Sequence, residues 1–354
     1  RLLGVDPLSV SGFVHPISAL RKAGVNITPD QVSFSYSHTN SLRWLAQAEG
    51  PEVAAHAGLA EPDCARVVEA ARQRLFALRE TRVRPARDDK VLTSWNAMAI
   101  DGMAFAARVF GEPRWAASAR RALDFVRAEL WRDGRLLATH KDGRSHLNAY
   151  LDDYASLLAA MLELMQGGEM LADDLRFARE LADALLARFE DPRDGGFFFT
   201  SHDHEALVLR PKSGHDGATA SGNGVAVMQL QRLGHLVGET RYLQAAERAL
   251  SLFAPEIARV PHAFPTLVTA LAEWRSPSAI VVLTGPAGSL DPWREALARR
   301  YGPGTVVVSV SGDEAGLPEA LAKPLGDRPQ AWVCRGTQCL SPIDALEALR
   351  VALQ

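Results

Sequence analysis

Carboxylates stand at or just before the beginnings of three stretches whose apolar residues recur at helical spacing. The aspartates concerned are Asp88, Asp89, Asp152, Asp153 and Asp216. Paired carboxyl groups in different surroundings have separated pKa values and can serve as general acid and general base. We therefore take these five residues as candidate catalytic groups.

Polar and aromatic residues that could bind a hydroxyl-rich ligand lie close to these aspartates along the chain. The candidate substrate-binding residues are Lys90, Ser94, Trp95, Asn96, Tyr154, His202, His204, Arg210, Lys212, His215, Ser221 and Asn223. Helix N-termini favour anions and hydroxyl-rich ligands, and Trp95 offers a flat face for a sugar ring. The alternative is that the serines and aspartates only cap helices and that Trp95 packs in the core.

Two other motifs could be taken for a metal site and a nucleotide site. His202-Asp203-His204 with His215-Asp216 matches no standard zinc spacing, and a strand would point His202 and His204 to one side with or without a metal. The glycine-containing turn from Gly285 to Ser289 lacks the lysine of a phosphate-binding loop. We therefore expect neither a metal nor a cofactor.

The elements that must position these residues repeat along the chain. Apolar residues recur at helical spacing from about residue 63 to 275. The segment from Ser94 to Val126 aligns without a gap on Ser221 to Phe253, and a looser third copy starts at Asp152. Each unit is a helix, a short turn, a second helix, a β-hairpin and a long polar loop. The β-hairpins are predicted at residues 133–139 and 194–200.

Such a unit cannot bury its own apolar stripe, so neighbouring units must stack side by side. The small residues of the first helix in each pair favour crowding around a central axis. The sequence thus predicts a mainly α fold, an α/α toroid of helical hairpins, with all long loops at one mouth. It predicts about eight helices, fewer than six complete hairpins would need, so whether the ring closes stays open.

The end of the chain has another pattern. Short apolar runs at residues 279–283, 305–310 and 331–334 alternate with helical segments at about 291–301, 314–322 and 343–353. This alternation predicts a small α/β unit with a parallel sheet. We expect three parts: a poorly matched N-terminal segment (1–60), the toroid (61–276) and the α/β unit (277–354).

Composition limits the partners and the compartment. The formal charge of −3 removes the simplest argument for nucleic acid or an anionic membrane as partner. No apolar run approaches the ~18 residues of a membrane span, and no signal peptide is expected. Cys64, Cys334 and Cys339 are too few for a disulfide framework, so we expect a cytoplasmic protein. Cys334 and Cys339 could form a regulatory disulfide, but we expect two buried thiols.

Several motifs together carry a family resemblance. They are Arg84-Pro85, Asp88 to Asn96, Leu151 to Ala155, Gly195 to Phe198, Arg210-Pro211-Lys212, Asp216 to Ala218 with Ser221-Gly222-Asn223, and Val333-Cys334-Arg335 near Cys339. On these motifs the chain resembles the YyaL and spermatogenesis-associated protein 20 family from about residue 63 to its end. The resemblance implies an α/α toroid similar to six-hairpin glycosidases and N-acylglucosamine 2-epimerases. It also implies an N-terminal thioredoxin-like domain, which we expect this chain to lack.

Two functions follow as expectations. The first is a carbohydrate-binding or carbohydrate-processing toroid, with glycosidase-like or epimerase-like activity at the mouth and a small-molecule ligand such as a sugar. The second is a non-catalytic scaffold that presents a thioredoxin-like domain to protein clients, in which case the chain's own loops would plug the mouth.

Overall fold

The computed structural model describes residues 2–4, 32–34, 58, 60–84, 86–168, 170–205, 207–302, 304–312 and 316–354. The chain divides into two compact units, Arg1–Asp88 and Asp89–Gln354. The first unit contains the parallel strands β1 (Leu2–Gly4) and β2 (Val32–Phe34) and the helix α4 (Glu61–Glu80). Most of the predicted segment 1–60 lies outside the described residues. The division falls at residue 88, whereas the sequence prediction began the toroid at residue 61.

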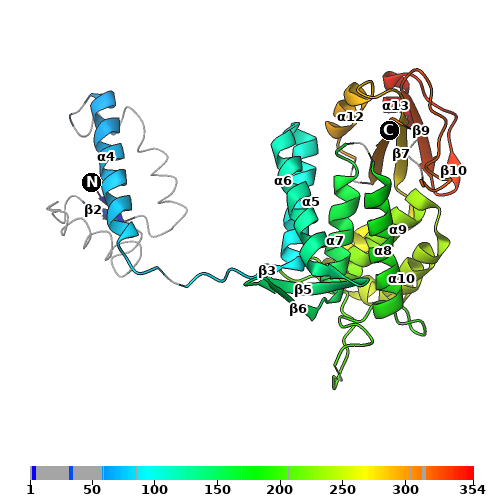
Figure 1. Ribbon diagram of the computed structural model, residues 1–354, viewed down its shortest axis with the longest axis horizontal. Coiled ribbons are helices and arrows are strands. Elements are labelled where there is room, and N and C mark those ends of the chain that lie inside the picture. Colours follow the sequence, from blue (N-terminus) through cyan, green and yellow to red (C-terminus); the bar gives the residue numbers. More distant parts are fainter. Residues whose placement is uncertain are drawn as a thin grey trace. The chain divides into compact units, whose positions relative to one another are not determined.

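The second unit begins with helical hairpins (Figure 1). These are α5 (Thr93–Phe110) with α6 (Pro113–Phe125), α7 (Leu151–Leu164) with α8 (Ala172–Phe189), and α9 (Gly222–Val237) with α10 (Thr240–Arg259), followed by α11 (Pro265–Arg275). The helices α5 and α9 end at Gly111 and Gly238, whose positive φ angles of 68° and 71° are readily adopted by glycine. The predicted mainly α fold of α/α hairpins is confirmed.

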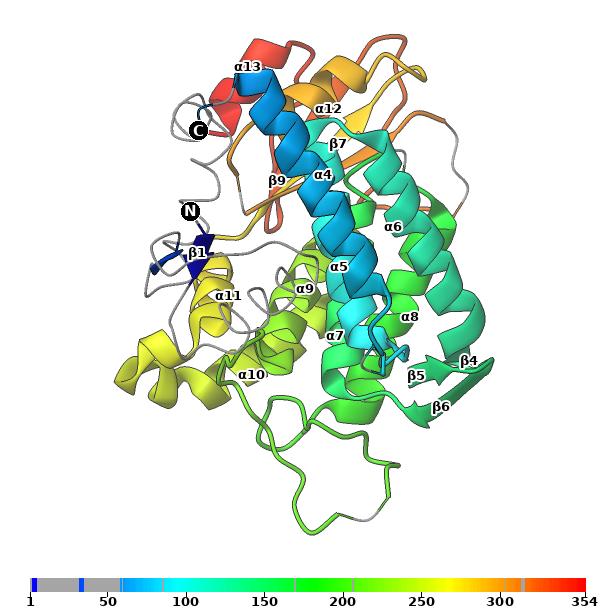
Figure 2. The same ribbon diagram turned by 90° about the vertical axis from the view of Figure 1, so that its left-hand side faces the viewer.

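The first helices of the hairpins lie side by side. In succession α5 packs on α7, α7 on α9 and α9 on α11 (Figures 1 and 2). Fully buried alanines such as Ala97, Ala160 and Ala226 let these inner helices approach closely. The hairpins therefore form an arc of the α/α toroid type. In the described part of the second unit, α5 is the first of these inner helices and α11 is the last.

The connectors differ in structure. The segment after α6 forms β4 (Trp131–Arg132), β5 (Arg135–Lys141) and β6 (Arg144–Asn148), which join β3 (Val91–Leu92), the strand before α5, in an antiparallel sheet. The predicted hairpin at 133–139 is thereby confirmed. At the predicted hairpin of 194–200 the chain turns back but forms no extended strands. An isolated antiparallel bridge joins Glu190 to Phe197, flanked by hydrogen bonds from the Phe198 N–H to the Phe189 carbonyl and from the Asp191 N–H to the Gly196 carbonyl. The N–H and C=O of Phe197 point away from this bridge, and the side chain of Asn223 bonds both.

The C-terminal part is a mixed sheet with two helices. Its elements are β7 (Ala279–Thr284), α12 (Asp291–Ala298), β8 (Thr305–Val310), β9 (Gln330–Arg335), β10 (Gln338–Cys339) and α13 (Leu346–Ala352), in the strand order β10-β9-β7-β8. The strands β7 and β8 are parallel, but β9 is antiparallel to β7, so the prediction of a parallel sheet is wrong. The predicted helix at 314–322 is wrong as well, since the described residues 316–322 form turns around Pro318. Without a helical crossover, β9 returns antiparallel.

This C-terminal sheet covers the end of the hairpins that carries the tight turns, opposite the β3–β6 strands (Figure 1). The Met170 N–H donates to the Ser309 carbonyl, and the Val307 N–H donates to Oε1 of Gln166. One face of the sheet, which includes Ile280 and Val308, belongs to the same apolar core as the hairpins. A separate domain over 277–354 stays a prediction.

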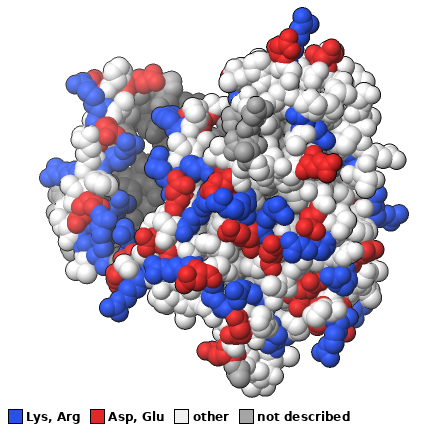
Figure 3. All heavy atoms as spheres, turned by 45° about the vertical axis from the view of Figure 1, so that its right-hand side comes forward, with Lys and Arg blue, Asp and Glu red and all other residues white. Residues whose placement is uncertain are grey.

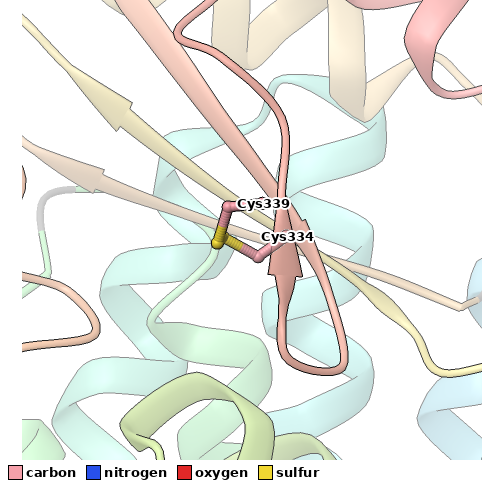
Figure 4. Close-up of a disulfide and its surroundings, with 2 residues drawn as sticks. All are labelled: Cys334 and Cys339. Atoms are coloured by element: carbon pink, nitrogen blue, oxygen red, sulfur yellow. A yellow bond between two sulfur atoms is a disulfide. The ribbon is translucent and has the colours of Figure 1, made fainter.

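Cys334 and Cys339 form a disulfide (Figure 4). They stand opposite each other on the antiparallel strands β9 and β10, and Cys339 is exposed. The prediction of two buried thiols is wrong because the register of the two strands brings the sulfur atoms together. Cys64 is a free cysteine.

No described helix is long and apolar enough to cross a membrane. Basic and acidic side chains are intermixed over the face seen in Figure 3.

The buried phenol of Tyr154 joins α7 to the connector sheet, since its oxygen accepts the Leu136 N–H at 2.8 Å. We predict that Tyr154→Phe lowers the free energy of unfolding by about 1–3 kcal/mol, because the buried N–H loses its acceptor. Urea unfolding measures the change. Tyr301→Phe is the control: its side chain is exposed, so it should change stability by less than about 0.5 kcal/mol. Equal effects of the two substitutions would contradict this prediction.

Candidate functional site

A cavity of about 630 Å³ follows the concave side of the arc. Residues of α5, α7 and α9 line it, together with the segment after α12. Met98, Ser156 and Val225 all line this cavity, each four residues after Ser94, Asp152 or Ser221. Equivalent positions of the three repeats therefore face one space, as expected if successive hairpins point in the same sense.

Two ion pairs neutralise arginines around the cavity. The Arg108 guanidinium donates to Oε1 of Glu163 from Nε at 2.9 Å and from Nη2 at 2.6 Å. The Arg232 guanidinium forms two hydrogen bonds with the Glu273 carboxylate, at 3.0 and 2.5 Å. Bidentate pairs of this kind fix the planar guanidinium groups. The positive charges of Arg108 and Arg232 in the cavity wall are thus already balanced.

Asp101 lines the same cavity and is half-buried. Among the described residues it has no hydrogen-bond partner or ion pair within contact distance. Burial raises the pKa of its carboxyl group, although the positive charges of Arg232 and Arg108 act in the opposite direction. A half-buried carboxyl group that faces a cavity can bind a ligand hydroxyl or exchange a proton with it.

The sequence analysis missed Asp101. It considered acidic residues at helix starts, and Asp101 lies two turns inside α5. A signal was present, because Asp101 and Arg108 are seven residues apart on one face of an otherwise apolar and small-residue helix.

Asp152 is a predicted catalytic residue whose carboxyl group can still bind a ligand. It is half-buried, burial raises its pKa, and no described residue donates a hydrogen bond to it. Its Oδ1 would lie 2.2 Å from a Cβ atom at Gly222, so only glycine allows this close approach to the start of α9. Asp152 stands one helical turn before the cavity residue Ser156.

Asp153 and Asp216 instead join the starts of neighbouring inner helices. Asp153 accepts the N–H groups of Ser94 at 2.8 Å and Tyr150 at 2.9 Å, which links α5 to α7. Asp216 accepts the N–H groups of Ser221 at 2.9 Å and Thr266 at 2.8 Å, which links α9 to α11. Burial opposes ionisation of Asp216, but the hydrogen bonds from Ser221 and Thr266 outweigh it and lower the pKa. The arrangement agrees with the capping alternative for these two residues.

Most of the other predicted residues near the helix starts also make internal bonds. Ser221 accepts the Gly224 N–H and caps α9, and the buried Asn223 bonds Phe197 and the Ser213 carbonyl. Asn96 donates only to the carbonyl of Leu92. The internal bonds of Ser94 and Tyr154 are described above.

The predicted residues before α5 are exposed. Asp89 pairs with Lys141 at 2.9 Å, and Asp88 and Lys90 lie beside it on the surface. The side chain of Trp95 is 67% exposed, so the alternative that it packs in the core is wrong.

The polar connector between α8 and α9 is held by its own contacts. Lys212 pairs with the buried Asp191 at 2.8 Å, and this hydrogen bond lowers the pKa of Asp191 to about 2. Arg210 donates to the Thr200 carbonyl and stacks over the Phe198 ring at 4.1 Å. These two predicted binding residues therefore stabilise the connector.

The predicted histidines do not converge on one point. His202 lines a separate hollow against the outer helix α8, His204 lies beside the Tyr150 ring, and the exposed His215 contacts the Phe264 ring. Among the described residues, no group of three His, Cys, Asp or Glu side chains could hold a metal ion.

Because the buried carboxyl group of Asp153 titrates differently in the folded and unfolded chain, we predict that the free energy of unfolding depends on pH. Burial raises its pKa from 3.8 to about 6, against the hydrogen bonds from Tyr150 and Ser94. The folded state therefore binds this proton more tightly than the unfolded chain. The resulting stabilisation is complete below about pH 4 and is lost as the pH rises through about 6. The loss is on the order of 2–3 kcal/mol.

The measurement is the free energy of unfolding of the wild type and of Asp153→Asn between pH 4 and 7. The difference between them, wild type minus variant, should decrease over this range, because the variant cannot titrate at this position. A difference that stays constant or increases with pH would contradict the raised pKa.

No family model matches the chain, but several curated proteins are similar to it in sequence. Spermatogenesis-associated protein 20 of Homo sapiens is 29% identical over 290 residues, which are 77% of this chain and 37% of the human protein. An uncharacterised protein of Caenorhabditis elegans is 26% identical over 324 residues, which are 88% of this chain and 44% of that protein. The chain thus spans less than half the length of these relatives.

Among solved structures, the cellobiose 2-epimerase from Spirochaeta thermophila is similar at 20% identity with a TM-score of 0.39. The likeness covers 48% of this chain and 44% of the epimerase, and at that TM-score it carries no argument about activity. The curated relatives, in contrast, agree with the family predicted from the motifs. The chain is similar in sequence to spermatogenesis-associated protein 20.

Proposed function

We propose that the concave cavity of the arc binds a carbohydrate and that Asp101, in the cavity wall, is the first carboxyl group that acts on it. The second is Asp152, which is not a lining residue but stands one helical turn before the lining residue Ser156. The observation that carries the proposal is Asp101, a half-buried carboxyl group in the wall of a cavity of about 630 Å³. It forms no hydrogen bond or ion pair within contact distance with the described residues, although the charges of Arg232 and Arg108 act on it. Cavities of roughly 300–1,000 Å³ with a few polar groups are typical of small-molecule sites. A mono- or disaccharide fits that range.

The two carboxyl groups lie at different depths on neighbouring inner helices. Asp152 is at the start of α7, and Asp101 is two turns into α5. Burial raises the pKa of both carboxyl groups, so each holds its proton at a higher pH than an ordinary aspartate and can donate it to a ligand. Glycosidase-like or epimerase-like turnover would use these groups as acid and base.

The scaffold alternative requires that the chain's own loops fill the opening. Of the described residues of the 200–220 connector, Ala220, next to the start of α9, lines the cavity and the others do not, which supports a ligand site over a plugged mouth. Protein clients and a cytoplasmic location stay predictions.

A thermal-shift panel tests the proposal with glucose, mannose, glucuronic acid, cellobiose and maltose, each also followed for product formation. We expect at least one sugar to raise the melting temperature, since a ligand at a hundred times its Kd adds about 2.7 kcal/mol of stability. Asp101→Asn and Asp152→Asn should reduce the shift and abolish any turnover.

The matched control is Asp124→Asn, which changes an exposed aspartate of α6 outside the cavity and should leave the shift unchanged. No response to any of the five sugars, with all three variants behaving as wild type, would refute a carbohydrate site.

A further inference from the structure

Two exposed aromatic side chains line the cavity from different parts of the second unit. Phe105 on α5 is 52% exposed, and Tyr301, in the segment between α12 and β8, is 90% exposed. The large aromatic side chains of the hairpin core, such as Tyr154 and Phe189, are fully buried. Leaving a phenylalanine exposed forgoes roughly 1.5–3 kcal/mol of burial, so its position calls for an explanation.

The Phe105 ring and the backbone next to Tyr301 are held in place. The Arg108 guanidinium lies over the Phe105 ring, 5.3 Å from its centre, and the Glu163 carboxylate fixes that guanidinium. The backbone around Tyr301 is anchored on both sides, since the Arg300 N–H donates to Leu297 and the Thr305 N–H donates to Gly302. The Arg300 side chain also bonds the Leu353 carbonyl next to α13. A ligand would therefore meet an aromatic ring and a segment that need little ordering on binding.

The polar groups of the cavity complement these rings. Asp101 lies one helical turn before Phe105 on the same face of α5, and the side chain of Gln229 lines the opposite wall on α9. A pyranose ring has C–H groups on its faces and hydroxyl groups around its edge. Aromatic rings suit the faces, and carboxyl and amide groups suit the edge.

We propose that Phe105 and Tyr301 are the stacking surfaces for a sugar ring whose hydroxyl groups bond Asp101. This inference rests on the proposed function and adds that the C-terminal α/β part supplies one wall of the ligand site. Residues before β8 would then help to determine which sugar binds.

Isothermal titration with the same five sugars tests the inference. Phe105→Ala and Tyr301→Ala should each weaken binding about three- to tenfold, the effect expected from losing one stacked ring. Phe105→Trp and Tyr301→Phe retain an aromatic face and should bind within about twofold of the wild type. Phe110→Ala is the control, because Phe110 is 74% exposed on the same helix but does not line the cavity.

The outcomes separate the two proposals. If a sugar binds and Phe105→Ala and Tyr301→Ala bind it as the wild type does, the stacking surfaces are refuted while the carbohydrate site stands. If none of the five sugars binds the wild type, the carbohydrate site and the stacking surfaces are both refuted. Loss of binding in the alanine variants with retention in Phe105→Trp and Tyr301→Phe supports the inference and excludes a folding defect as the cause.

Discussion

The structure depends on carboxylates that each bond the starts of two successive inner helices. Asp153 joins α5 to α7 through two backbone N–H groups, and Asp216 joins α9 to α11 in the same way. Between the helix starts that Asp153 and Asp216 join, Asp152 of α7 lies against Gly222 at the start of α9. A hairpin cannot bury its apolar stripe alone, and these bonds fix how its neighbours line up while the stripes pack. The shared register then puts equivalent residues on one concave face.

Polar groups have different tasks along the inner helices. At the helix starts, the backbone N–H groups without partners in their own helices are satisfied by Asp153, Asp216 and Ser221. Deeper in the helices the backbone is bonded to itself, and the Arg108–Glu163 and Arg232–Glu273 ion pairs join neighbouring inner helices. Asp101 lies at that depth but forms no hydrogen bond or ion pair with the described residues, so its carboxyl group faces the cavity.

The repeat made the hairpins and their common direction predictable, because a helix–turn–helix unit with glycine at the turn has few ways to stack. Functional assignment was harder. A capping aspartate and a catalytic aspartate have the same sequence signature, and only burial and hydrogen bonds distinguish Asp153 from Asp152. The hairpin expected at 194–200 is reduced to a single bridge between Glu190 and Phe197, and the side chain of the distant Asn223 bonds the outward N–H and C=O of Phe197. His202 was misplaced because the direction of an irregular connector depends on such distant contacts.

The charge balance of the cavity differs along its wall. Arg108 and Arg232 are each paired with a half-buried glutamate, so a ligand carboxylate beside them would have to compete with an existing ion pair. Separating a half-buried pair costs more than the exchange returns, since one carboxylate is left without its partner. Arg299 pairs with Glu295 at an exposed position, and the Arg300 guanidinium donates to the Leu353 carbonyl. Asp101 adds a carboxyl group that accepts or donates a hydrogen bond to a neutral hydroxyl without such competition. Beside Asp101, Arg108 and Arg232, the arrangement therefore favours a neutral hydroxyl group over a ligand carboxylate.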